Sequence, residues 1–178
     1  MKGRATDTQI KLGTVEQKIK FIVESMNEDI EYIFSNWAQA NVKLDKVKRP
    51  SIVYVLPPSG TLTFSWRDVK DRPNSMIAFV CNTKFDFDGR ENDGIIEEMK
   101  RLCIRFVRKF NESGLFEMLD GNIHYRVLYD FLDVNVTGIV IEPTLVEKEG
   151  VSLCCEPFNR REDDIPIPPT GDNPHSIT

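Results

Sequence analysis

An amphipathic helix in the second half of the sequence constrains the fold most strongly. Segment 95–110 carries apolar residues at spacings of three and four, which form one stripe along a helix of 3.6 residues per turn. The stripe consists of Ile95, Ile96, Met99, Leu102, Cys103, Phe106, Val107 and Phe110. Short apolar runs typical of β-strands lie on both sides of this segment. We therefore expect the helix to form the layer against which a sheet packs.

The charges at the two ends of this helix suit its dipole. Asp93 and Glu97 lie near the predicted N-terminus, where negative charge is favourable, and Arg108 and Lys109 lie near the C-terminus, where positive charge is favourable. Gly114 can adopt the positive φ with which many helices end. The sequence therefore predicts both ends of the helix.

The size and charge of the chain indicate one domain that is not built for nucleic acid. A chain of 178 residues buries roughly 70% of its unfolded surface. Its net charge of −5 argues against a dedicated nucleic-acid-binding protein. We expect a single domain over residues 14–153, an N-terminal arm over 1–13 and an extended C-terminal arm over 154–178.

The cysteines and the hydropathy pattern exclude two further classes. The four cysteines show no C-x-x-C spacing and the two histidines complete no zinc pattern, so we expect reduced thiols and neither a metal nor a cofactor. No apolar run approaches the ~20 residues that cross a bilayer, and the start of the chain has no secretory h-region. We expect assembly in a cytoplasm, and we expect no membrane partner.

A long helix is predicted near the N-terminus, over 14–37. Its apolar positions recur at spacings of three and four: Val15, Ile19, Ile22, Met26, Ile30, Ile33 and Trp37. Thr14 can act as the N-cap, and Gln17 can complete a capping box. The pattern therefore predicts an amphipathic helix of about 25 residues.

Three strands are predicted between the two helices. Segment 51–56 is apolar and β-branched, and 61–66 alternates, with its apolar residues Leu62, Phe64 and Trp66 on one face. The turn between these segments contains two prolines and a glycine, so we expect a hairpin with one buried face. A charged loop over 67–74 then leads to a third strand over 75–81.

Two or three strands are predicted after the central helix. Segment 123–134 is β-prone, and its expected core face comprises Tyr125, Val127, Tyr129, Phe131 and Asp133. Segment 134–143 adds another strand, and 144–153 could form an edge strand. The expected class is α+β with a mixed or antiparallel sheet, in the order αβββαββ.

The acidic loop 82–93 is a candidate partner-binding site. Its Asp86-x-Asp88-Gly89 run suggests calcium, but an EF-hand register would place Lys84 and Ile95 where carboxylates are required. Phenylalanines are unusual in so polar a loop, which suggests that a partner covers them. We therefore predict a contact made by Phe85, Asp86, Phe87 and Asp88.

The C-terminal segment is rich in proline and charge. From Glu156 onward it contains half of the ten prolines of the chain, which favours an extended conformation. Phe158, Ile165 and Ile167 are apolar side chains on this extended strip. Such a strip can lie along another protein, so these three residues are predicted partner contacts.

No catalytic motif is present, and we expect the protein not to be an enzyme. There is no Gly-rich phosphate loop, no G-x-S-x-G and no H-E-x-x-H. A nuclease motif of the type (Asp/Glu)-x-Lys could be assigned to Asp68 or Glu98, but neither has a suitable upstream aspartate. His124 lies on the more polar face of its predicted strand and is expected at the surface.

The order of predicted elements resembles the tail-terminator and neck proteins of tailed bacteriophages. The resemblance is carried by 14–37 as a long first helix, by 51–66 as the hairpin, and by helix 95–110 packing across the sheet. It covers roughly residues 14–150 and is architectural. Its implication is a non-enzymatic ring of identical subunits, six or twelve, that joins the tail to the portal or capsid and lets DNA pass.

The resemblance also implies the partners and the location. The partners would be other copies of the chain and the neck, portal or tail proteins, with DNA only as passing cargo, in a virion assembled in the host cytoplasm. The acidic loop would face the lumen or a partner, and the C-terminal arm would grip an adjacent subunit. The alternative is a small intracellular α+β adaptor or enzyme subunit that forms no ring.

Overall fold

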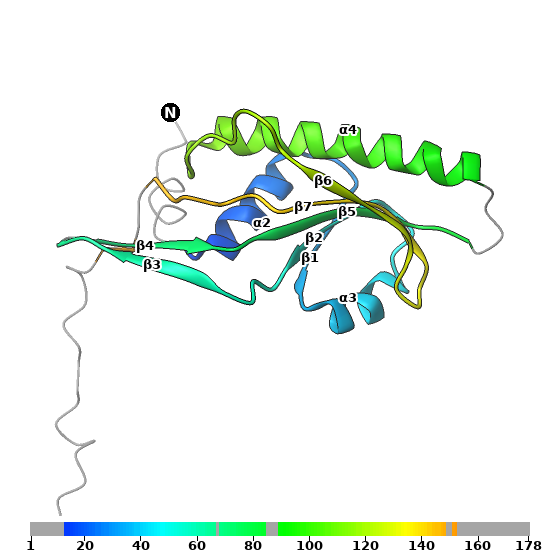
Figure 1. Ribbon diagram of the computed structural model, residues 1–178, viewed down its shortest axis with the longest axis horizontal. Helices are drawn as coiled ribbons and strands as arrows, with labels where there is room; N and C mark the ends of the chain where they lie inside the picture. Colours follow the sequence, from blue (N-terminus) through cyan, green and yellow to red (C-terminus); the bar gives the residue numbers. More distant parts are fainter. Residues whose placement is uncertain (1–12, 67, 85–88, 149–150, 153–178) are drawn as a thin grey trace, which may run out of the picture.

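The computed structural model describes residues 13–66, 68–84, 89–148 and 151–152, and over these residues it is an α+β fold with a mixed sheet (Figure 1). Three helices are described: α2 (Val15–Ser25), α3 (Trp37–Leu44) and α4 (Gly89–Ser113). The expected α+β class with a mixed sheet is confirmed. The predicted arms, 1–13 and 154–178, lie almost entirely outside the described residues.

The main sheet has five strands in the order β1-β2-β5-β7-β6. Their bounds are β1 (Glu31–Ser35), β2 (Ser51–Val55), β5 (Met76–Asn82), β6 (Tyr125–Phe131) and β7 (Val136–Ile141). β1 pairs with β2 in parallel, and the other pairs are antiparallel. β1 and β6 are therefore the two edges of this sheet.

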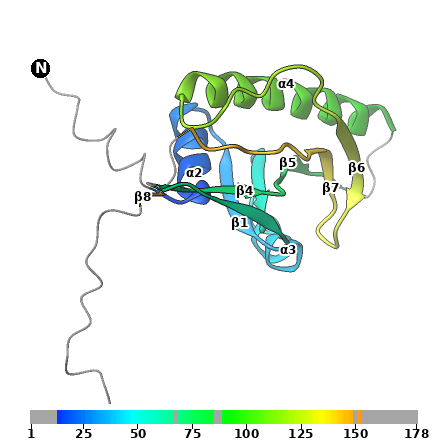
Figure 2. The ribbon, with the colours of Figure 1, turned by 60° about the vertical axis from the view of Figure 1, so that its left-hand side comes forward.

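Helices cover both faces of the main sheet (Figures 1 and 2). α2 and α4 pack on one face through a core that includes Ile19, Phe79 and Phe106. α3 packs on the other face, where Ala40 and Leu44 meet alternate residues of the strands. Every residue of β2 and β7 is buried, as expected for central strands with both faces covered.

The central helix is confirmed, and it is longer than predicted. α4 buries Ile96, Met99, Leu102, Cys103, Phe106 and Phe110, all members of the predicted stripe. It begins at Gly89, so the acidic residue of its first turn is Glu91 rather than Asp93 or Glu97, and its last turn contains no basic residue. Gly114 follows the helix with φ of +67°, as predicted.

The prediction of one continuous helix over 14–37 is wrong. Its start is confirmed, because Thr14 and Gln17 form the capping box. The helix ends at Ser25, however, and Asn27 follows with φ of +53°, a conformation that asparagine tolerates. The chain then enters β1, whose backbone pairs with β2, and Asn36 caps a separate helix, α3. The predicted order αβββαββ therefore fails in this region.

The predicted hairpin of 51–56 with 61–66 is also wrong. β2 already has β1 and β5 as neighbours, so it cannot pair with the next strand. Instead β3 (Gly60–Phe64) pairs with β4 (Asp68–Pro73), which occupies most of the predicted charged loop. β8 (Val151–Ser152) pairs with β4 and completes a second sheet, in the order β3-β4-β8. The edge strand predicted over 144–153 is thus limited to two residues.

The predicted core face of 123–134 is wrong in two respects: its residues are mostly exposed, and Phe131 packs on the α3 side against Trp37 because the register shifts between Leu128 and Phe131. Tyr125 and Val127 are paired with residues of β7 that face α4, yet they are 48% and 47% exposed, and Tyr129 is 48% exposed. β6 is an edge strand, and α4 does not cover its outer side. The buried residue of this strand is Leu128, which faces the α3 side.

Gly138 in β7 is required by the close approach of β5. A Cβ at this position would lie 2.0 Å from the backbone oxygen of Phe79 and 2.9 Å from Cα of Val80. Because backbone cannot give way as a side chain does, we expect Gly138→Ala to lower the free energy of unfolding by about 3 kcal/mol. Urea denaturation measures the free energy of unfolding. Gly94→Ala is the control, since nothing lies within 4 Å of its added Cβ.

Candidate protein-interaction surfaces

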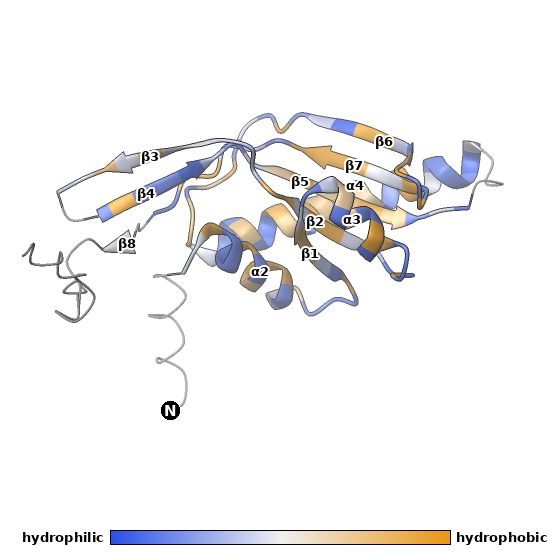
Figure 3. Cartoon of the chain, turned by 90° about the horizontal axis from the view of Figure 1, so that it is seen from below, coloured by the Kyte–Doolittle hydropathy of each residue, from blue (hydrophilic) through white to orange (hydrophobic). Residues whose placement is uncertain are grey.

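The β3–β4 hairpin carries the most exposed large apolar side chains among the described residues. It extends away from the layers of the main sheet (Figures 1 and 3). Leu62, Phe64 and Trp66 are 58%, 71% and 84% exposed, and every residue of β3 is exposed. We call these three residues the hairpin stripe. Alternation along β3 places Leu62 and Phe64 on one face, with Thr61 and Thr63 on the other, and Trp66 follows in the turn after this strand.

The hairpin stripe is chemically suited to contact another protein. Fully burying one Leu or Phe side chain is worth about 1.5–3 kcal/mol, and aromatic residues are enriched in the centres of interfaces. Single exposed apolar residues are common, but here Leu62 and Phe64 share one face of a projecting strand and Trp66 lies in the turn after it. The prediction that this apolar face is buried within the domain is therefore wrong, and the face is available at the surface.

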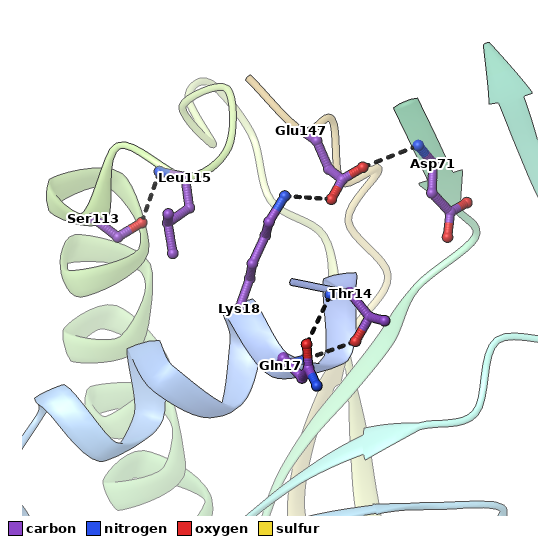
Figure 4. A network of polar contacts seen from close by, with 7 residues as sticks. All are labelled: Thr14, Gln17, Lys18, Asp71, Ser113, Leu115 and Glu147. Atoms are coloured by element: carbon purple, nitrogen blue, oxygen red, sulfur yellow. Dashed lines mark hydrogen bonds and ion pairs between the residues drawn. The ribbon is translucent and has the colours of Figure 1, made fainter. Parts of the chain in front are cut away.

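A buried polar network lies beside the middle of the hairpin, where Asp71 pairs with Leu62 (Figure 4). The ammonium of Lys18 in α2 donates to Glu147 Oε1 at 2.6 Å, and the side chains are 1% and 3% exposed. The other carboxylate oxygen, Oε2, accepts the backbone N–H of Asp71 in β4 at 3.0 Å. Glu147 thereby joins α2 to the hairpin strand.

An aromatic ring lies beside this network. The ammonium of Lys18 lies 5.9 Å from the centre of the Phe116 ring. Burial, together with the negative charge of Glu147, raises the pKa of Asp71. The sequence contains one signal of this site, since Lys18 falls at helical spacing among Val15, Ile19 and Ile22, where an apolar residue is expected.

A second candidate surface is a groove between α4 and the edge strand β6. The groove has a volume of about 340 Å³ and an almost entirely apolar lining. Its lining residues are Lys100, Cys103, Ile104, Val107, Arg108, Ile123, Tyr125, Ile139 and Ile141. We call it the α4–β6 groove. Sequence reasoning missed it because the half-exposed Tyr125 and Val127 look like core residues of a strand.

The predicted partner-binding residues lie outside the described part of the chain. This holds for Phe85, Asp86, Phe87 and Asp88 of the acidic loop, and for Phe158, Ile165 and Ile167 of the C-terminal segment. The predicted bounds of the loop are too wide, because Asn82 ends β5 and residues 89–93 form the start of α4. The calcium interpretation of this loop also depends on residues that are not described.

The residues of the nuclease alternative are not brought together. Asp68 lies in the hairpin, where its carboxylate accepts a hydrogen bond from Ser65, whereas Glu98 lies exposed on α4. Within the described ranges there is no group of three side chains suited to hold a metal ion. His124 is exposed, as predicted. The described residues therefore contain no recognisable catalytic set.

Two cysteines are described, Cys81 and Cys103, and they are not bonded to each other. Burial raises the pKa of the Cys103 thiol from 9.0 to about 11 and also raises that of Cys81. Since the thiolate is the reactive form, neither residue is suited to act as a nucleophile at neutral pH.

The raised pKa of Cys103 predicts slow thiol chemistry. In a variant with the other three cysteines replaced by serine, we expect an aromatic disulfide reagent to react about 100-fold more slowly at pH 8 in buffer than in denaturant. Burial disfavours the thiolate, so the rate should rise about tenfold per pH unit up to about pH 11. Equal rates in buffer and denaturant would contradict the buried position.

Comparison with known proteins gave no relative. No family model matches the chain, and neither a curated protein nor a solved structure matches it. Among the helices of the described residues, none has the length and hydropathy needed to span a membrane.

Proposed function

We propose that the chain is a ring-forming structural protein of a tailed bacteriophage, either a tail terminator or a subunit of the head-to-tail connector. In this role it joins the tail to the portal or capsid and leaves a channel for DNA. The observation that carries the proposal is the projecting hairpin with its exposed stripe of Leu62, Phe64 and Trp66.

A ring needs two different surfaces on each subunit. In a head-to-tail contact, one surface of a subunit binds a different surface of the next, and the ring closes when the rotation per subunit divides a full turn. The hairpin stripe and the side of the domain that carries the α4–β6 groove are two such surfaces, and they are formed by different elements. Their separate positions support a heterologous ring rather than a two-fold dimer.

The attachment of the hairpin supports a mechanical role. Glu147 connects β4 to α2 through the bonds to Asp71 and Lys18, so the middle of the hairpin is fixed to the helical layer. A fixed projection loses less conformational freedom on binding than a loose loop does. The hairpin is therefore suited to set the angle between neighbouring subunits.

Negative-stain imaging of the purified chain, alone and mixed with portal and tail components, tests the proposal. We expect closed rings with a central channel in at least one of the two samples, the chain alone or the mixture. A chain that remains monomeric or dimeric with every component would contradict the ring. It would favour the adaptor that forms no ring.

A further inference from the structure

The α4–β6 groove lacks a partner in the described structure although its floor is built from the domain core. Cys103, Ile139 and Ile141 form the floor and belong to the core on the α4 side. Ile104 and Tyr125 form the walls and are 52% and 48% exposed. An apolar groove that opens beside an edge strand can accept an extended segment that pairs with the strand and inserts side chains into the groove.

Positive charge borders the groove along α4. Lys100 lines it and donates to Glu97 at 2.6 Å, with its ammonium 5.2 Å from the centre of the Tyr125 ring. Arg108 also lines the groove, and Arg101 is exposed one residue after Lys100. Within the described part of the chain, Arg101 and Arg108 form no ion pair. The groove is thus suited to an apolar segment that carries acidic residues.

The C-terminal segment of this chain has that composition. Glu162, Asp163 and Asp164 are followed directly by Ile165-Pro166-Ile167-Pro168. In an extended chain alternate residues point to the same side, so the two isoleucines would face one way. The isoleucines also retain their backbone N–H groups, whereas the prolines between them have none. The segment can therefore donate backbone hydrogen bonds along one edge only. Proline is tolerated in a sheet at an edge strand, where its missing N–H faces away from the partner strand.

The linker before the two isoleucines is as long as the longest helix of the domain. Twelve residues, 153–164, separate the end of β8 at Ser152 from Ile165. At 3.3–3.6 Å per residue they span up to about 40 Å. The 25-residue helix α4 is itself about 37 Å long at 1.5 Å per residue. The linker can therefore span a distance about as long as α4.

We propose that residues 162–168 occupy the α4–β6 groove, with Ile165 and Ile167 on its apolar floor and the acidic run against Arg101 and Arg108. The segment pairs with the outer edge of β6, which in the described structure is bonded only to β7. The inference concerns the site that receives the segment and does not require a ring. A ring that fails to form would leave it intact.

A peptide titration tests the inference on the full-length protein. The acceptor is the full chain with Ile165→Asp and Ile167→Asp, so that its own segment cannot compete. The probe is a fluorescent peptide with the sequence of residues 156–172, followed by anisotropy. We expect saturable binding, and at least tenfold weaker binding when both isoleucines of the peptide are replaced by serine.

Charge reversal identifies the groove as the binding site. Arg101→Glu with Arg108→Glu in the acceptor should weaken the peptide at least tenfold, and lysines at peptide positions 162–164 should restore binding. Lys20→Glu with Lys43→Glu makes the same change of charge on α2 and α3 and should have little effect. No binding, or binding that both pairs of variants weaken equally, would overturn the inference.

Discussion

A chain with Leu62, Phe64 and Trp66 all replaced by serine is expected to remain folded and to lose self-assembly. The three side chains are mostly exposed, so their removal should change the free energy of unfolding by no more than about 1 kcal/mol. If they are the centre of the subunit contact, their loss removes most of its binding energy. Analytical ultracentrifugation measures assembly, and urea denaturation measures folding.

The hairpin itself supplies the matched control. Thr61→Ser and Thr63→Ser change the opposite face of the same strand, where both residues are exposed. This variant should assemble as the unchanged chain does. If the serine triple variant assembled normally, or if the threonine variant lost assembly equally, the hairpin stripe would not be the contact surface.

Lys18→Met is expected to cause the largest loss of stability among the buried polar positions. It leaves the carboxylate of Glu147 buried without its cationic partner, and breaking a buried pair in this way costs about 3–5 kcal/mol. The measurement is the free energy of unfolding at neutral pH. Since Glu147 also holds Asp71, the hairpin should open first, and hydrogen exchange of the Asp71 amide should report it.

A second substitution separates charge from packing. Lys18→Met with Glu147→Gln removes both charges and retains an oxygen that can accept the Asp71 N–H, so most of the lost stability should return. Lys20→Met is the control, because Lys20 is on the exposed side of the same helix and its side chain is 53% exposed. A double variant as unstable as Lys18→Met would show that packing around the lysine stem matters more than the charge.

The elements with a single consistent period could be predicted from the sequence. The stripe from Ile96 to Phe110 has only a helical spacing, and β2 and β7 are short segments rich in β-branched residues. In each case local pattern and tertiary burial agree. The capping box at Thr14 was predictable for the same reason, since it depends on residues three apart in the chain.

The first helix was mispredicted because its second half fits two periods. Ile30 and Ile33 continue the helical spacing, but Ile33 also alternates with Tyr32 and Phe34, which lie on the opposite face of β1. Pairing with β2 decides between these alternatives, and that contact involves residues about 20 positions away. A local pattern does not contain this information.

The interaction surfaces could be predicted only in part. The alternation of Leu62, Phe64 and Trp66 was visible, but its exposure depends on β2 having two other neighbours. The α4–β6 groove depends on β6 being an edge strand, and the Lys18–Glu147 pair joins residues 129 positions apart. Each of these features arises from long-range topology rather than from residue spacing.

The native mass of the purified full-length chain tests the proposed ring most directly. Mass photometry should give one species at six or twelve times the mass of the chain, either for the chain alone or after addition of portal or tail components. A species of one or two chain masses under all these conditions would contradict the ring.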